Sequence, residues 1–273
     1  MRWASAIEYD GGAYHGWQFQ PDRPTVQGHV ENALSRVANA PVKTVCSGRT
    51  DAGVHAAEQV VHFDSDSNRS ADAWLLGSNR YLPPDIAPQW FVPVPDEFSA
   101  RYDAWARDYH YAILDRRAPS ALWRARAWHV HQRLDEALMR RGATALIGEH
   151  DFSAFRAAAC QAHSPWRNLH HIKIQRCGDW LYFDIRANAF LHHMVRNIVG
   201  SLVQVGRRRR PPEWIAELLA VRDRRRAGAT APAHGLTLMR VHYPSDSSVS
   251  RRVAVKDAGH TTDHRARPAD AKI

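Results

Sequence analysis

The segment from Ser47 to Ala56 holds the residue types best suited to carry chemistry in this chain. A single carboxylate, Asp51, lies between Gly48 and Gly53, with Arg49 two residues upstream. In an extended segment, side chains two residues apart point to the same face, and the glycines permit close approach of a large ligand. An ionised carboxylate with a cationic partner can act as a covalent nucleophile without a metal or cofactor. The pattern alone favours a plainer interpretation, which is a polar turn with a surface ion pair. Features elsewhere in the chain are needed to distinguish such a turn from a catalytic loop.

Three histidine pairs raise the question of a metal site: His192-His193, His170-His171 and His129/His131. None has the HExxH spacing of a zinc site. Adjacent residues on a helix point about 100° apart, so neighbouring histidines there rarely share an ion. We therefore predict packing or surface roles for them and no bound metal. The chain also lacks GxGxxG, Walker A and GxSxG motifs, so we expect no nucleotide cofactor and no serine nucleophile.

The charge balance indicates a polyanionic partner. The chain has 37 Lys and Arg against 28 Asp and Glu, a net charge of +9, and it carries 10 tryptophans that can serve a core or stack on bases. Two runs concentrate arginine, Arg207–Arg210 and residues 222–226. Each run fits a phosphate-binding patch, and each also fits a solvated face that complements the dipole at the end of a helix.

Other features indicate a cytoplasmic globular protein. The three cysteines, Cys46, Cys160 and Cys177, form no CxxC motif, so we expect reduced thiols. The first residues lack the apolar region of a signal peptide, and no apolar run approaches the length needed to span a membrane.

The elements that must position Asp51 follow from periodicity and capping signals. In the first half we expect two helices, capped by Thr25 and by Ser70. The expected strands there are 3–9, 42–46, 59–63 and 90–94. The loop that carries Asp51 would follow the second of these strands.

The second half repeats this mixture of strands and helices loosely. We expect a hairpin around Gly178, a helix capped by Asp135, a long apolar helix over 191–205 and a further helix after Pro211-Pro212. Strands are also expected at 107–114 and 236–243. The composition predicts a disordered, mildly basic tail over 244–273.

These residues resemble the tRNA pseudouridine synthase A family. The resemblance rests first on the loop Gly48-Arg49-Thr50-Asp51-Ala52-Gly53-Val54-His55. Further matching segments follow in order: 8–11, 16–18, 59–63, 98–101, 109–111, 151–155, 165–168, 188–197 and 235–236. Together they span roughly residues 3–243.

The resemblance implies isomerisation of uridine to pseudouridine at positions 38, 39 and 40 in the anticodon arm of tRNA. It implies no cofactor and a homodimer in which both subunits contact the tRNA. The implied fold is α+β, with two ferredoxin- or RRM-like halves whose sheets merge around a basic catalytic cleft. We accordingly expect an N-terminal half over 1–105 that carries the Asp51 loop, and a C-terminal half over 106–243.

The resemblance also implies roles for individual residues. Asp51 would be the nucleophile, Arg196 its ion-pair partner, and Tyr109 the ring that stacks on the flipped uracil and relays a proton. Arg49 would then be left to occupy the vacated base position and hold phosphate. Weaker candidates for contacts to phosphate are Arg101, Arg167, Arg207, Arg208, Arg209 and Arg210. The order of bond making, at C6 of uracil, at C1′ of ribose or through a glycal, stays open.

The alternative is a non-catalytic RNA-binding protein on the same scaffold. It would explain the charge and the tryptophans. It would not require Asp51, Arg196 and Tyr109 together.

Overall fold

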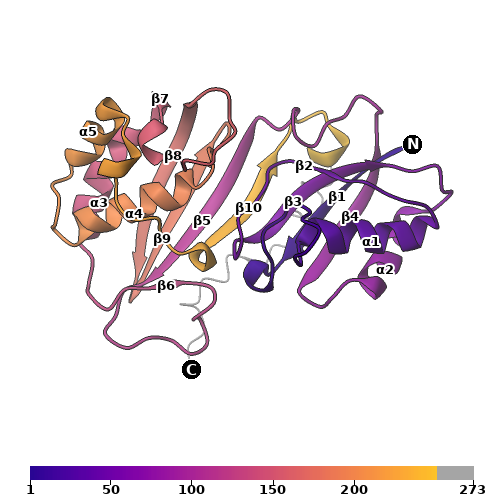
Figure 1. The fold of residues 1–273 in the computed structure, drawn as a ribbon, viewed down its shortest axis with the longest axis horizontal. Coiled ribbons are helices and arrows are strands. Elements are labelled where there is room, and N and C mark those ends of the chain that lie inside the picture. The colour runs from indigo at the N-terminus through magenta and orange to yellow at the C-terminus, as the bar shows by residue number, and fades with distance from the viewer. Residues whose placement is uncertain (251–273) are drawn as a thin grey trace. The chain divides into compact units, whose positions relative to one another are not determined.

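The computed structural model describes residues 1–250, and they form a mixed α+β fold (Figure 1). The chain divides into two compact units. The first contains Met1–Thr50, Ala56–Trp105 and the described residues from Val241 onward, and the second contains Asp51–His55 and Ala106–Arg240. Two segments are grouped differently from the expected halves 1–105 and 106–243: Asp51–His55 belongs with the second unit, and the residues from Val241 onward belong with the first.

The first unit is an antiparallel sheet with two helices. Its strands are β1 (Arg2–Tyr9), β2 (Val45–Cys46), all but the first residue of β3 (His55–Asp64), and β4 (Ile86–Val94), and its helices are α1 (Val26–Ala38) and α2 (Ala71–Tyr81). Strand β1 lies between β3 and β4, and β2 pairs with β3.

Both helices of the first unit begin where their capping residues predict. The Thr25 hydroxyl accepts a hydrogen bond from the Gly28 amide at 3.4 Å, and the Ser70 hydroxyl accepts one from Ala73 at 3.1 Å. Each cap satisfies an amide that the first turn of a helix leaves without a backbone partner. Helix α2 then packs on the sheet through the fully buried Trp74.

The second unit is a larger sheet covered by helices. Its strands are β5 (Ala106–Leu114), β6 (Trp128–His129), β7 (Gly148–Asp151), β8 (Trp166–Cys177), β9 (Trp180–Ala187) and most of β10 (Leu236–His242), and its helices are α3 (Glu136–Ala143), α4 (Met194–Gly206) and α5 (Trp214–Val221). The strand order is β10-β5-β9-β8-β7, and β6 pairs with β5. Gly178 has a φ of 56° in the turn between β8 and β9, which confirms the predicted hairpin.

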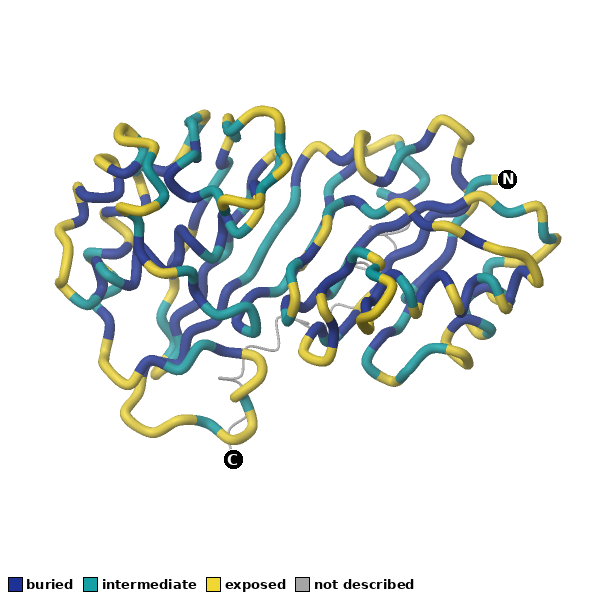
Figure 2. The backbone as a smooth tube through the Cα atoms, in the orientation of Figure 1, coloured by how far each residue is buried: buried dark blue, intermediate teal, exposed yellow. Residues whose placement is uncertain are grey.

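The alternation of side chains in β5 sets the two faces of this sheet. Tyr111 and Ile113 point into the main core, which contains much of α4, whereas Ala112 and Leu114 belong to a smaller cluster on the other face. Figure 2 shows the resulting buried stretches of backbone along these strands. Helix α4 is buried along most of its length, so its residues have fixed positions in the core.

Some element boundaries differ from the predictions. The expected strand over 42–46 is limited to Val45–Cys46, and the helix expected from residue 191 begins only at Met194. Of the expected disordered tail, residues 251–273 lie outside the described residues. Residues 244–250 are described, and Val249 among them is 1% exposed, so the ordered chain continues past the predicted boundary.

Within residues 1–250, no helix is long and apolar enough to cross a membrane. Cys46, Cys160 and Cys177 are free thiols.

Three histidines, of which His62 is buried and His171 and His234 are half-buried, predict a loss of stability in acid. Burial lowers the pKa of His62, His171 and His234 below the ordinary 6.5. As the pH falls, these histidines are therefore protonated in the unfolded chain before they are protonated in the folded protein. Their contribution to the free energy of unfolding is full above about pH 6.5 and decreases as the pH drops below that value. His62 contributes directly, because its Nδ1 accepts a hydrogen bond from the Ala100 amide at 3.0 Å and protonation would remove that acceptor.

We expect the midpoint of urea unfolding to fall between pH 7.5 and pH 5.5. In His62→Asn, whose amide oxygen can replace Nδ1 as the acceptor, the fall should be smaller. A midpoint that is constant over this range, or that rises in acid, would contradict the prediction.

Candidate active site

The segment Asp51–His55 is fixed within the second unit by its own residues. Val54 is 1% exposed in the main core, and its amide donates to the Asp51 carbonyl at 3.1 Å. The buried His55 lies with Nε2 at 3.0 and 3.2 Å from two backbone carbonyls. Gly53 has a φ of 77°, a conformation that favours glycine. These contacts hold the Asp51 carboxylate at the rim of the core, with 19% of the side chain exposed.

Arg196 of helix α4 forms an ion pair with Asp51. Its Nη1 donates to Asp51 Oδ2 at 3.0 Å, and its Nε donates to the Ala231 carbonyl at 2.8 Å. The Ala231 amide donates back to the Arg196 carbonyl at 3.1 Å. The structure thus brings together two residues that lie 145 positions apart in the sequence. Because the guanidinium is held at two points, it fixes the position of one carboxylate oxygen and leaves Oδ1 to other groups.

Two histidines complete the surroundings of the carboxylate. His192 Nε2 lies 3.3 Å from Asp51 Oδ1, and His193 Nε2 lies 3.3 Å from Oδ2. The prediction that these histidines would diverge on a helix is wrong, because both precede α4. His193 has a φ of 62° and serves as the residue before the first turn, which lets both rings face Asp51. The one signal in the sequence was their position three and four residues before Arg196.

Burial lowers the pKa of His193, and this effect exceeds the opposing effect of Asp51. The neutral form of this imidazole is therefore favoured beside the carboxylate.

A glycine on α4 allows the chain segment that holds Arg196 to approach the helix. A Cβ built on Gly200 would lie 1.9 Å from the Ala229 carbonyl oxygen, and the neighbouring Gly228 amide donates to the Ser201 hydroxyl at 3.0 Å. The segment reaches Ala231, the acceptor for Arg196, two residues later.

We therefore expect Gly200→Ala to lower the free energy of unfolding by about 2–3 kcal/mol, because the clash is with backbone that cannot move aside without cost. The matched control is Gly48→Ala, where an added Cβ meets nothing within 4 Å. Its effect should stay within about 0.5 kcal/mol. Equal urea midpoints for the two variants would contradict this account.

Tyr109 lies on β5 and is half-buried. Its ring packs edge-on against Phe190, with centroids 5.0 Å apart. Phe190 comes two residues before His192, so Tyr109 contacts the chain segment that leads into the site.

Arg49 and Arg101 belong to the first unit and are both exposed. Between Arg49 and Asp51, Thr50 is buried and shares a 2.7 Å hydrogen bond with the Tyr9 hydroxyl. The Arg101 guanidinium lies 5.3 Å from the centre of the Tyr102 ring.

Arg167 lies at the start of β8 and is half-buried. It donates to the Ser164 carbonyl at 2.9 Å, while its Nε is buried with no hydrogen-bond partner among the described residues. Burial lowers the pKa of its guanidinium.

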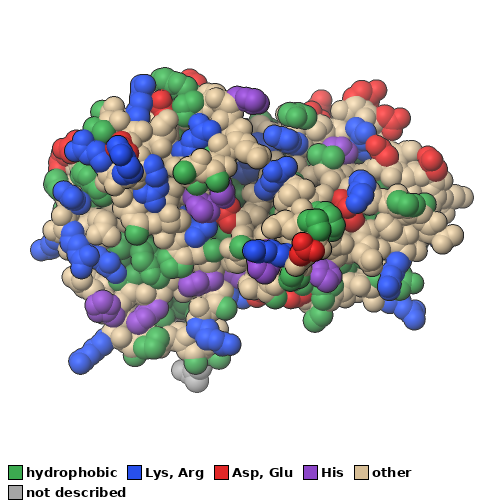
Figure 3. Space-filling model, viewed as in Figure 1, with side chains coloured by type: hydrophobic (Ala, Val, Ile, Leu, Met, Phe, Trp, Pro, Cys, Tyr) green, Lys and Arg blue, Asp and Glu red, His purple; other side chains and the backbone are tan. Residues whose placement is uncertain are grey.

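The basic run Arg207–Arg210 follows α4, and two of its members have partners within the protein. Arg208 pairs with Asp135 at 2.8 Å, and the Arg210 guanidinium lies 5.3 Å from the centre of the Trp214 ring. Burial lowers the pKa of Arg207. In the view of Figure 3, many Lys and Arg side chains lie on the surface of the second unit.

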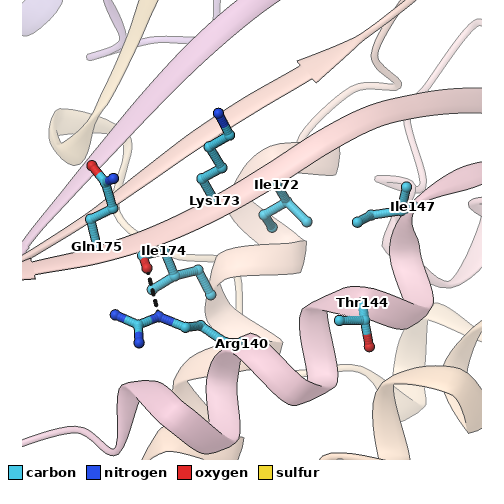
Figure 4. A pocket seen from close by; sticks show the side chains of 7 residues that line it. All are labelled: Arg140, Thr144, Ile147, Ile172, Lys173, Ile174 and Gln175. Atoms are coloured by element: carbon cyan, nitrogen blue, oxygen red, sulfur yellow. Dashed lines mark hydrogen bonds between the residues drawn. The ribbon is translucent and has the colours of Figure 1, made fainter.

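A separate groove of about 440 Å³ lies between α3 and β8 (Figure 4). Arg140, Lys173 and Gln175 line it together with Thr144 and three isoleucines. It contains neither a carboxylate nor any residue singled out from the sequence, so it is not a second candidate for the same chemistry.

Comparisons with known proteins agree with the motifs. A sequence model described as tRNA pseudouridine synthase matches residues 5–103 and 143–244. Three relatives are each called "tRNA pseudouridine synthase A". The one from Aeromonas hydrophila is 53% identical over 246 residues, 90% of this chain and 91% of that protein. The one from Aliivibrio salmonicida is 50% identical over 251 residues (92% and 96%), and the one from Actinobacillus pleuropneumoniae is 52% identical over 244 residues (89% and 93%).

Among solved structures, a chain of "Crystal Structure of a Cbf5-Nop10-Gar1 Complex" aligns with a TM-score of 0.35 at 11% identity, covering 86% of this chain and 57% of that chain. The sequence matches confirm the resemblance seen in the motifs: the chain belongs to the tRNA pseudouridine synthase family.

Proposed function

We propose that this protein converts uridine to pseudouridine at positions 38, 39 and 40 in the anticodon arm of tRNA, with Asp51 as the nucleophile. The observation that carries the proposal is the half-buried Asp51 carboxylate, held by Arg196 within hydrogen-bond distance at one oxygen. Family membership and the names of the relatives support tRNA as the substrate.

The reaction suits a site of this composition. The N1–C1′ bond of uridine breaks, the uracil turns, and a C5–C1′ bond forms, while C5 loses a proton and N1 gains one. No electrons or atoms are lost overall, so acid–base groups and a carboxylate can supply the chemistry. Oδ2 is anchored by Arg196, and Oδ1 contacts the more exposed His192, so Oδ1 is the oxygen that we assign to the attack; the bond that it forms to uridine is broken again before pseudouridine is released.

The target base must leave its stack before Asp51 can reach it, at a cost of a few kcal/mol. In this proposal Tyr109 stacks on the flipped uracil and its hydroxyl relays the C5 proton. Arg49 fills the space that the base leaves and contacts phosphate. The exposure of Arg49 fits a residue that meets RNA.

The remaining arginines would hold the backbone of the tRNA. Arg101, Arg167 and the run Arg207–Arg210 are the candidates, in a homodimer whose two subunits both contact one tRNA. The net charge of +9 favours such a partner, and the cytoplasm, where tRNA is modified, is the compartment that we propose.

The proposal is tested by mapping pseudouridine in unmodified tRNA incubated with the purified protein. We expect new pseudouridines at positions 38, 39 and 40, together with tritium release from tRNA labelled at uridine C5. If the protein binds the tRNA but leaves it unmodified after prolonged incubation at a stoichiometric concentration, the non-catalytic alternative is favoured.

The basic run offers a test of the contacts to phosphate. Each lost contact should reduce the slope of log Kd against log salt by roughly one. We expect Arg209→Gln to weaken tRNA binding and reduce this slope. Arg208→Gln should do so less, because Arg208 is paired with Asp135. An unchanged slope in Arg209→Gln would indicate that the run is a solvated face and not a phosphate-binding patch.

A further inference from the structure

The groups around Asp51 have the composition of a metal site as well as that of an anion with its partners. One carboxylate and two imidazoles present their ligand atoms within 4.8 Å of one another. Two adjacent histidines on a helix would point about 100° apart and rarely share an ion. In the structure His192 and His193 precede α4 and converge on the same carboxylate.

We propose that Asp51, His192 and His193 bind one zinc-like divalent ion, and that this ion inhibits the enzyme by occupying the carboxylate. The binding itself depends only on the geometry, whereas the inhibition rests on the function proposed above. Two histidines and a carboxylate form a donor set that suits Zn²⁺ and Co²⁺ better than Mg²⁺.

The distance from His192 to the carboxylate agrees with a tetrahedral ion on Oδ1. Bonds of 2.0–2.1 Å from zinc to nitrogen or oxygen place two ligand atoms about 3.3–3.4 Å apart at a tetrahedral angle. His192 Nε2 lies 3.3 Å from Oδ1, which matches this spacing, whereas His193 Nε2 lies 3.3 Å from Oδ2 and has to approach Oδ1 to complete the site. Three protein ligands also leave one position open for water, as in zinc sites that bind small molecules.

The backbone holds His193 in place. The Asn197 amide donates to the His193 carbonyl at 2.9 Å, in the first turn of a helix that is mostly buried. With a φ of 62°, His193 has a left-handed conformation, which is uncommon for residues other than glycine but is found more often for His, Asn and Asp. The backbone of His193 is therefore fixed beside Asp51, and only its side chain has to move to bring Nε2 toward Oδ1.

Arg196 is the group that opposes a cation here. Its Nε bond to Ala231 keeps the guanidinium on Oδ2, so Oδ1 is the oxygen available to the metal. Removing this positive charge should strengthen metal binding even though it harms catalysis. An ion on Oδ1 would also block the oxygen that we assign to the attack on uridine.

The binding test uses Co²⁺ and Zn²⁺ on the full-length, metal-free protein without tRNA. We expect one Co²⁺ per chain, with visible absorption of a low-coordinate site that Zn²⁺ displaces. His192→Asn and His193→Asn should each weaken binding about ten-fold or more, and asparagine is chosen because it tolerates the backbone of His193. Arg196→Gln should bind Zn²⁺ more tightly. The control is His131→Asn, which alters an exposed histidine outside the cluster. Binding that is absent, or that is equal in all these proteins, overturns the proposal.

The activity test separates the two proposals. Tritium release is measured with a chelator and with added Zn²⁺, in excess Mg²⁺ to keep the tRNA folded. If the protein is active in chelator and loses that activity at the Zn²⁺ concentration that fills the site, both proposals are supported. If the protein binds the metal stoichiometrically but is inactive in chelator, only the synthase function is rejected. Full activity with the site filled rejects inhibition by the metal.

Discussion

Replacing Asp51 by asparagine is expected to reduce tritium release from uridine-labelled tRNA roughly 10⁴-fold or more, a loss typical of removing a nucleophile. The amide has nearly the same shape as the carboxylate, and its oxygen can still accept from Arg196 Nη1, which lies 3.0 Å from Oδ2 in the native protein. The variant loses only the negative charge and the nucleophilic oxygen. We therefore expect tRNA to bind within about three-fold of the native Kd.

Two measurements make this result specific to chemistry. The urea midpoint of Asp51→Asn shows whether the segment Asp51–His55 remains folded, and Val54 and His55 should hold it in place. A filter-binding titration with unmodified tRNA gives the affinity. Release within ten-fold of the native rate, from a folded variant that binds tRNA, would remove Asp51 from the role of nucleophile.

Local signals predicted most elements of the fold. Thr25, Ser70 and Asp135 each accept the expected hydrogen bond at the start of a helix, and Gly178 makes the expected turn. These features depend on a few neighbouring residues, so a sequence contains them directly.

The site contains features that local sequence signals do not predict. Periodicity extended the apolar helix back to residue 191, yet α4 begins at Met194 because His193 adopts a left-handed conformation. That choice depends on contacts made by the folded unit, and it decides that both histidines face Asp51. The partner of Asp51 was a similar case. Spacing could suggest only Arg49, whereas Arg196 came from the resemblance to a family.

The arginine runs show the same limit in another form. Four consecutive arginines suggest a patch for RNA, but Arg208 is engaged with Asp135 and Arg210 with Trp214. In residues 222–226, Arg224 donates to Asn197 and Thr230 inside the fold. A count of charges therefore overstates the number that remain for a ligand.

Arg196 gives the second large expected effect, because it is the guanidinium that holds Asp51. Arg196→Gln should lower kcat by about 10²–10³-fold, the scale of losing one preorganised electrostatic partner. Arg196→Lys retains the charge but has one nitrogen in place of the fork that reaches both Ala231 and Asp51. Its kcat should therefore lie between those of the native protein and the glutamine variant.

The comparison of kcat with Kd decides what Arg196 does. A residue that contacts phosphate would raise Kd and reduce its salt dependence when removed, with kcat at saturating tRNA little changed. A residue that fixes the carboxylate should lower kcat while Kd and the salt slope stay near native values. Since Arg196 is 14% exposed and both its observed bonds are within the second unit, the second pattern is expected. Single-turnover tritium release with saturating enzyme measures that step directly, and a native rate in Arg196→Gln would leave the ion pair as a structural contact only.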